Sequence, residues 1–340
     1  MNNPPVTYRL LTGFDDPSAG EQTWNALLGK SSANVIFMTH QWQRVWWEVF
    51  GRGTLLIIIA EQEEKVIAIA PLFSDGGMIF FVGSGGSDYL DFIGDYSDPA
   101  VLPNMLRLAK ESVSVFLGFR FYHVREDSST KELIFAAERE NQWRAFDEGE
   151  LPAPFLDIKR FPDRAEAATN KKSLKRHEAW FAKNGGFFFE HFTESKDILL
   201  HLPLFCEQHI KRWESTPYPS LFLDPQQVLF YRRITEVFSG TGWLRFTRII
   251  WKGNAIAYHF GFLYARSFLW YKPTFDIALA KHSPGEVLLR QLLLFAITEG
   301  ADRFDFGLGD ESFKERFATG SVTVKTWGLY PLLPENKKIL

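Results

Sequence analysis

Hydrophobic residues cluster into six short runs that fall in two separate stretches of the chain, with polar turns between the runs. The runs are rich in β-branched and aromatic residues, and residues of that kind bounded by short polar turns favour β-strands joined by tight turns. They span residues 54–62, 65–73 and 78–83 in the first stretch, and 243–251, 254–263 and 268–273 in the second. Each stretch therefore predicts three consecutive antiparallel strands.

The two stretches resemble one another. A shift of 189 residues aligns Ile67-Ala68 with Ile256-Ala257, and Phe80-Phe81 with Leu269-Trp270. A helical pattern and another strand follow in both cases, over 99–111 and 116–124 and over 284–299 and 303–308. A shared shift indicates a diverged duplication, although two hairpins can also be similar by chance.

Three further helical patterns precede the second stretch, over 167–186, 195–213 and 224–240. Pro152 and Pro154 interrupt the chain between the two halves and mark a hinge. The sequence thus predicts two domains, 1–150 and 151–340, which suits a length of 340 residues.

Composition narrows the class of protein. Apolar residues make up 46% and charged residues 23%, which is typical of a globular chain, and a net charge of −3 gives no positive field for DNA. Cys206 is the only cysteine, so a disulfide within the chain is excluded and no thiolate zinc site or other metal motif is indicated. Without a signal-like start or an apolar run long enough to span a bilayer, we expect a cytoplasmic protein with no membrane insertion.

The stretch Ser283-Pro284-Gly285-Glu286 begins the helical pattern over 284–299 and can be interpreted in two ways. As local structure it is a capping box, with Ser283 as the N-cap, Pro284 at the first helical position and Glu286 three residues after the serine. As a binding site, exposed backbone N–H groups at a helix start hold anions, and Gly285 leaves room for close approach. The negative charge of Glu286 favours the first interpretation.

The order of these elements resembles the acyl-CoA-binding core of the GNAT acyltransferases. The similarity is greater to the CelD-like branch, associated with cellulose and exopolysaccharide biosynthesis and related to the Fem peptidoglycan aminoacyltransferases. The motifs that carry the resemblance are FMTHQWQRVWWEVFG (37–51), VIAIAPLF (66–73), SDYLDFIGD (87–95), KKSLKRHEAWF (171–181), SPGEVLL (283–289) and FDFGLGDESFKERFA (304–318).

The resemblance implies an α+β fold of two tandem GNAT-like halves, each a mostly antiparallel mixed sheet flanked by helices. It implies that 1–150 is the acceptor-side domain and that 151–340 binds acyl-CoA. Backbone amides at the helix start would hold the pyrophosphate, and a strand would flank the thioester. The residues concerned are Ser283, Pro284, Gly285, Glu286 and Val287 at the helix start, and Trp270, Tyr271 and Lys272 on the strand. The usual glycine-rich loop is reduced to Gly285.

Polar residues beyond the strand at 303–308 are candidates for the chemistry of acyl transfer, which needs a proton acceptor near the attacking group. Asp310 or Glu311 would serve as the base, and Asp305 and Lys314 would bind substrate. The alternative is a polar loop leading into a solvated helix.

Two further groups are candidate site residues. His259 and Tyr271 lie on predicted central strands, where an imidazole suits proton transfer and a phenol could protonate the leaving thiolate; a hydrogen-bonded core histidine is the alternative. Asp88, Tyr89 and Asp91 follow a glycine-containing loop and could bind the hydroxyls of an acceptor, or form a surface turn.

These observations predict an acyltransferase that moves an acetyl or longer acyl group from acyl-CoA to an amine or hydroxyl of a small or carrier-linked acceptor. From the resemblance, the favoured acceptor is an amino sugar or a polysaccharide precursor. No covalent nucleophile is evident, so transfer in a ternary complex is expected. The alternatives are a Fem-like transferase that uses aminoacyl-tRNA and a non-catalytic GNAT-like binding subunit.

Overall fold

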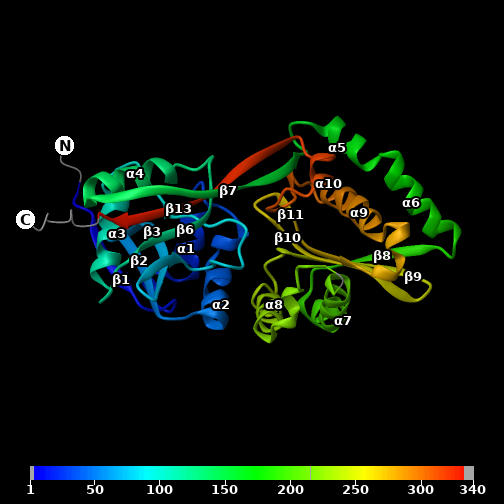
Figure 1. Cartoon of the computed structure of the whole chain (residues 1–340), viewed down its shortest axis with the longest axis horizontal. Helices are drawn as coiled ribbons and strands as arrows, with labels where there is room; N and C mark the ends of the chain where they lie inside the picture. The colour runs from blue at the N-terminus through cyan, green and yellow to red at the C-terminus, as the bar shows by residue number, and fades with distance from the viewer. Residues whose placement is uncertain (1–3, 215, 333–340) are drawn as a thin grey trace, which may run out of the picture. The chain divides into compact units, whose positions relative to one another are not determined.

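The computed structural model describes residues 4–214 and 216–332, and the chain divides into two compact units (Figure 1). Unit 1 contains Met1–Leu151 together with the described part of Val322–Leu340, and unit 2 contains Pro152–Ser321. Two long strands, β7 (Trp143–Asp157) and β13 (Gly320–Pro331), contribute residues to both units. Each unit is described separately below.

Unit 1 is built on a mixed sheet. Strand β1 (Thr7–Leu11) pairs with β2 (Thr54–Gln62), β2 with β3 (Lys65–Asp75), and β3 with β4 (Met78–Phe81), all antiparallel. β6 (Gly118–Arg125) then pairs in parallel with β4, and β13 pairs antiparallel with β6. The remaining elements are η1 (Pro17–Ala19), α1 (Glu21–Leu28), η2 (Ile36–Met38), α2 (His40–Phe50), β5 (Ile93–Gly94), α3 (Val101–Glu111) and α4 (Thr130–Asn141).

Unit 2 repeats this order. β8 (Phe187–Phe192), β9 (Leu244–Trp251), β10 (Asn254–Tyr264) and β11 (Ser267–Phe275) are successive antiparallel neighbours. β12 (Arg303–Asp305) pairs in parallel with β11 and antiparallel with β7. The remaining elements are α5 (Pro162–Thr169), α6 (Lys172–Lys183), α7 (Ser195–Trp213), η3 (Leu221–Leu223), α8 (Pro225–Val237), η4 (Ile277–His282), α9 (Pro284–Thr298) and α10 (Ser312–Glu315).

Both units therefore contain four antiparallel strands, a crossover helix and a parallel fifth strand. The crossover helix is α3 in unit 1 and α9 in unit 2. The crossover is needed because parallel neighbours cannot be joined by a tight turn. This repeated order confirms the predicted α+β fold of two related halves.

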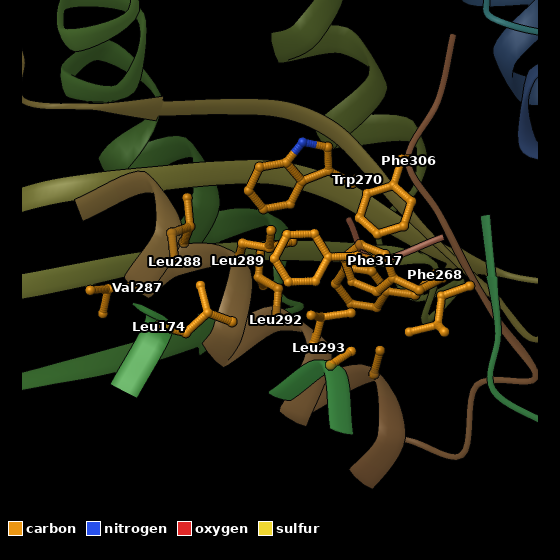
Figure 2. Close-up of a cluster of buried hydrophobic side chains, with 14 of the residues drawn as sticks. Leu174, Phe268, Trp270, Val287, Leu288, Leu289, Leu292, Leu293, Phe306 and Phe317 are labelled. Carbon is orange, nitrogen blue, oxygen red and sulfur yellow. The ribbon is translucent and has the colours of Figure 1, made fainter. Parts of the chain in front are cut away.

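Helix α9 forms the centre of the unit 2 core. Its sequence is almost entirely apolar, so it is buried on most sides, between the sheet and helices α5 and α6. Figure 2 shows Leu288, Leu289 and Leu292 of α9 beneath Trp270 of β11. Burying each leucine side chain contributes about 1.5–3 kcal/mol to the free energy of folding. The core thus fixes the start of α9 relative to β11.

Three expectations need correction or extension. The helix predicted over 167–186 is two helices, because α5 ends at Thr169 and Lys171 adopts an extended conformation before α6. The second half was expected to span 151–340, but the described residues from Val322 onward belong to unit 1, where Val324 of β13 pairs with Arg125 of β6. Several elements, including α1, α4 and β8, were not predicted.

Among the helices of the described residues, none combines the length and apolarity needed to cross a membrane.

Candidate active site

Strands β11 and β12 part after three residue pairs. The parallel pairing joins Ser267–Leu269 to Arg303–Asp305 and goes no further in the described chain. Beyond this point β11 continues beside β10, whereas the chain after β12 stays with β7. There the amides of Phe306 and Gly309 donate to the carbonyls of Pro154 and Pro152, at 3.0 Å in both cases. We call residues Trp270–Phe275 the diverging segment of β11.

The diverging segment begins with a β-bulge. Leu269 pairs with Phe262 and Lys272 with Phe260, so two residues of β11 oppose the single residue Gly261 of β10. A bulge of this kind re-aims side chains and increases the local twist of the strand. It therefore marks the place where β11 turns away from β12.

The bulge sends the rings of Trp270 and Tyr271 to different parts of the core. Trp270 lies over α9 among the buried apolar side chains (Figure 2), and Tyr271 stacks on Tyr231 of α8 with ring centroids 6.2 Å apart. Both side chains are buried. The Nζ atom of Lys272 lies 4.1 Å from the centre of the Tyr271 ring. Of these three predicted cofactor-binding residues, the two aromatic ones thus have side chains that pack in the core. Only their backbone is left to contact a cofactor along the diverging segment.

His259 is fully buried beside the bulge. Its ring stacks between Phe268 and Trp270, and its Nε2 accepts a hydrogen bond from the backbone N–H of Tyr271 at 3.2 Å. Burial lowers the pKa of His259 to about 3, so the imidazole is neutral at physiological pH. The geometry matches the core-histidine interpretation of the sequence, and it engages the backbone N–H of Tyr271.

The start of α9 differs from the predicted capping box. Ser283 is at the N-cap position, but its backbone is left-handed (φ 54°, ψ 55°) and its hydroxyl caps no amide. The amides of Glu286 and Val287 donate to the Ser283 carbonyl, at 3.0 and 3.3 Å, and Pro284 has no N–H. A Cβ on Gly285 would lie 3.1 Å from Cδ1 of Phe275. The helix start therefore offers few backbone donors to an anion.

The carboxylate of Glu286 at this helix start is held by two side chains. Arg316 Nη1 lies 3.1 Å from its Oε1, and His177 Nε2 lies 3.4 Å from its Oε2. The sequence analysis did not single out His177 or Arg316, because their spacing along the chain gives no sign that they meet. The positive charge of Arg316 offsets the negative charge that Glu286 brings to α9.

The polar loop after β12 is organised around a buried lysine. Lys314 is 3% exposed, and its Nζ donates to the Leu308 carbonyl at 2.6 Å and pairs with the Glu311 carboxylate at 2.7 Å. Asp305 is also buried, and its Oδ1 accepts a hydrogen bond from the Gly307 amide at 2.8 Å. Asp310 is exposed at the surface of the loop. The structure thus joins Glu311 to Lys314 and leaves Asp310 facing solvent.

Two of the three candidates in unit 1, Tyr89 and Asp91, are interior residues. Asp91 is buried, and its Oδ1 accepts hydrogen bonds from the Thr130 hydroxyl and from the Phe92 amide, the latter at 2.8 Å. Burial raises the pKa of Asp91 to about 6. Tyr89 is buried with the guanidinium of Arg125 5.5 Å from its ring centre, and Asp88 is partly exposed. Asp91 and Tyr89 therefore support the packing of unit 1 from within.

Comparison with known proteins finds a similarity to one family within unit 2. The family model described as an acetyltransferase (GNAT) domain matches residues 168–315. Among curated proteins, none matches the sequence.

Three solved structures are similar over nearly the whole chain. FemX has a TM-score of 0.67 at 11% identity, covering 96% of this chain and 97% of that chain. L-PGS from Bacillus licheniformis has a TM-score of 0.58 at 13% identity, covering 94% and 93%. A tandem GNAT protein from the clavulanic acid biosynthesis pathway has a TM-score of 0.51 at 11% identity, covering 97% and 100%. At such low identity these similarities show a shared fold. Residues 168–315 are therefore similar to a GNAT acetyltransferase domain, and the chain has a fold of two tandem GNAT-like halves.

Proposed function

We propose that this protein transfers an acyl group from an acyl-CoA thioester to the amine or hydroxyl of a small acceptor, and that the donor lies along the diverging segment of β11. The observation that carries the proposal is the parting of β11 and β12 at a bulge, inside the region that matches the GNAT family. A strand that loses its neighbour can pair with an extended ligand through backbone hydrogen bonds. The pantetheine arm of coenzyme A is such a ligand, since it contains two amide groups.

The chemistry is direct transfer between two bound substrates. The acceptor nitrogen or oxygen attacks the thioester carbonyl carbon, the carbon–sulfur bond breaks, and the acceptor proton passes through a base to the leaving thiolate. Cys206, the one cysteine, is buried in α7, and burial raises its pKa to about 12, which makes it a poor nucleophile. No acyl-enzyme on a thiol is therefore invoked.

Asp310 is the candidate base that fits best. Its carboxylate is exposed, whereas that of Glu311 is committed to Lys314. Lys314 holds the loop on which both acids lie, so it positions the base rather than exchanging a proton. The acceptor class favoured by the CelD-like resemblance is an amino sugar or a polysaccharide precursor.

A second donor, aminoacyl-tRNA in a Fem-like reaction, is the alternative if coenzyme A does not bind at the start of α9. The start of α9 bears the carboxylate of Glu286, and two of its first amides already donate to the Ser283 carbonyl. Both features weaken this helix start as the site for the diphosphate of coenzyme A.

Calorimetry and transfer assays with acetyl-CoA, longer acyl-CoAs and aminoacyl-tRNA separate these possibilities. The variant Gly285→Glu, which adds a negative charge beside Phe275, should weaken acyl-CoA binding. Gly13→Glu adds the same charge where an added Cβ meets no atom within 4 Å, and should have no effect. Melting curves of both variants check that they fold.

Transfer from acyl-CoA that is lost in Asp310→Asn supports the proposal. Transfer from aminoacyl-tRNA alone supports the second donor. If neither donor binds or reacts, the proposal is wrong, and a non-catalytic binding function is the better account.

A further inference from the structure

Arg212, in the last turn of α7, lies against the diverging segment of β11. Its Nη1 donates to the carbonyl of Pro273 at 2.8 Å, and its Cζ is 4.4 Å from the centre of the Phe275 ring. Its Cζ is also 5.5 Å from the centre of the Trp213 ring. These contacts bring the guanidinium to the part of β11 that no longer pairs with β12.

Arg212 differs from the other well-shielded arginines of unit 2 in having no acidic partner. Arg245, Arg248 and Arg290 each pair with a glutamate. Among the described residues no carboxylate forms an ion pair with Arg212, and burial lowers its pKa to about 10 with no acid to offset the effect. A partly buried cation with one carbonyl acceptor is costly to the fold, so an external anion is a natural partner for it.

Further hydrogen-bond donors and positive charge lie in the same region. The Nε1 of Trp213 is buried and forms no hydrogen bond within the described chain. Lys272 belongs to the diverging segment. Burial lowers the pKa of His209, and the positive charges of Arg212 and Lys272 lower it in the same direction, to about 3. His209 is therefore neutral, and its Nδ1 bonds the Ser220 hydroxyl at 2.8 Å. Arg212, Lys272 and the indole N–H of Trp213 thus bring two cations and a neutral donor to this region.

We propose that Arg212, with Trp213 and Lys272, binds a phosphate or diphosphate group of a substrate beside the diverging segment of β11. The planar guanidinium fork matches the geometry of phosphate oxygens, and the indole N–H supplies a neutral donor. The Phe275 ring contacts both Arg212 and the position of Gly285. The site is therefore one ring away from the start of α9. Arg212, rather than the amides of α9, then binds the anionic group of the substrate. The assignment to a substrate rests on the proposed acyltransferase function.

The test uses the whole protein and pyrophosphate as the probe, with chloride at matched ionic strength. Calorimetry should give binding to the wild type that is weakened roughly tenfold or more in Arg212→Met, because a charge-assisted hydrogen bond is lost. The control Arg232→Met changes an exposed arginine of α8 that pairs with Glu236, and should bind as the wild type does. Unliganded Arg212→Met should melt at the same temperature as the wild type or higher, since an uncompensated cation has been removed.

A structural role for Arg212 predicts the opposite pair of results, a lower melting temperature with unchanged pyrophosphate binding, and that outcome overturns the proposal. If Arg212→Met does not fold, the indole ¹⁵N–¹H resonance of Trp213 in the wild type, assigned with Trp213→Phe, provides the readout. It should move on adding pyrophosphate, and a stationary resonance refutes the site.

Competition between pyrophosphate and coenzyme A shows which substrate carries the phosphate group. If coenzyme A displaces pyrophosphate and pantetheine does not, the group belongs to the donor. If coenzyme A fails to displace it, the phosphate belongs to the acceptor. Pyrophosphate binding is measured without turnover, so a failure of acyl transfer and a failure of this site are distinguishable.

Discussion

The imidazole of His259 occupies the space that a side chain on Gly261 would need, two residues further along the same strand. A Cβ on Gly261 would be 2.1 Å from Cε1 of the ring and 2.5 Å from the Leu269 carbonyl oxygen. The absence of a side chain at Gly261 thus allows the imidazole to reach the Tyr271 amide in the bulge. The bulge of β11 depends on this pair.

Replacing Gly261 with alanine should therefore disturb the bulge. The new methyl group clashes with the ring and with backbone, and overpacking of this kind costs about 1–3 kcal/mol. We expect urea unfolding to show that loss, together with reduced donor binding. Gly13→Ala, at an open position, is the control and should leave both quantities unchanged. A Gly261→Ala protein as stable as the wild type would contradict this account of the bulge.

Acid should destabilise unit 2 through its buried histidines. The pKa values of His209 and His259 are lowered from 6.5 to about 3 by burial. Their contribution to stability is fully present above pH 6.5 and is lost as the pH falls toward 3, because only the unfolded chain takes up protons in that range. The loss is at most about 1.4 kcal/mol per pH unit for each group. Urea midpoints at pH 7 and pH 5 should differ less for His209→Gln than for the wild type, and an equal difference would count against this explanation.

Asp91 should have the opposite pH dependence in unit 1. Its pKa is raised from 3.8 to about 6, so its ionised form is penalised in the folded state and its contribution is lost as the pH rises through 6. Asp91→Asn keeps an oxygen that can accept from Thr130 and Phe92, and should stabilise the protein by about 1–3 kcal/mol at pH 8 but not at pH 4.

Thermal melts at the two pH values measure the effect of Asp91→Asn. Asp91→Ala, which loses both hydrogen bonds, should be less stable than the wild type at both. Should Asp91→Asn instead remove transfer activity while leaving stability unchanged, the carboxylate would belong to the site rather than to the interior.

Lys314 should matter to both stability and rate. Lys314→Met removes the bonds to the Leu308 carbonyl and Glu311, so the loop that bears Asp310 is no longer held. We expect a stability loss of about 1–3 kcal/mol and a fall in transfer rate of roughly tenfold or more, measured by melting and by initial rates. Glu311→Gln leaves the Lys314–Leu308 bond in place and should have a smaller effect. If Lys314→Met and Glu311→Gln are both fully active, Lys314 does not position the base.

The repeated strands could be predicted from sequence because their signal is local. The run over 54–62 coincides with β2, and that over 254–263 is one residue short of β10. The helix over 195–213 coincides with α7 despite Pro203 within it. β8 and β13 were missed, and their pairing is set by strands far away in the sequence.

The site was less predictable, because its contacts depend on distant residues. Ser283 and Glu286 fit a capping box by spacing, yet Glu286 pairs with His177 and Arg316, which no local pattern reveals. Arg212 follows Lys211 in the last turn of a helix, where basic residues are usually solvated, and only the fold brings it to Pro273. A glycine inside a strand does suggest a bulge, so Gly261 is a signal in the sequence that the expectations above did not use.

Hydrogen–deuterium exchange with donor present tests the central claim most directly, because it reports where the donor lies without requiring the acceptor. With a saturating acyl-CoA, peptides that cover Trp270–Phe275 should exchange more slowly, while peptides of unit 1 remain unchanged. Slower exchange confined to unit 1, or none in the diverging segment with either acyl-CoA or aminoacyl-tRNA, would contradict acyl transfer along β11.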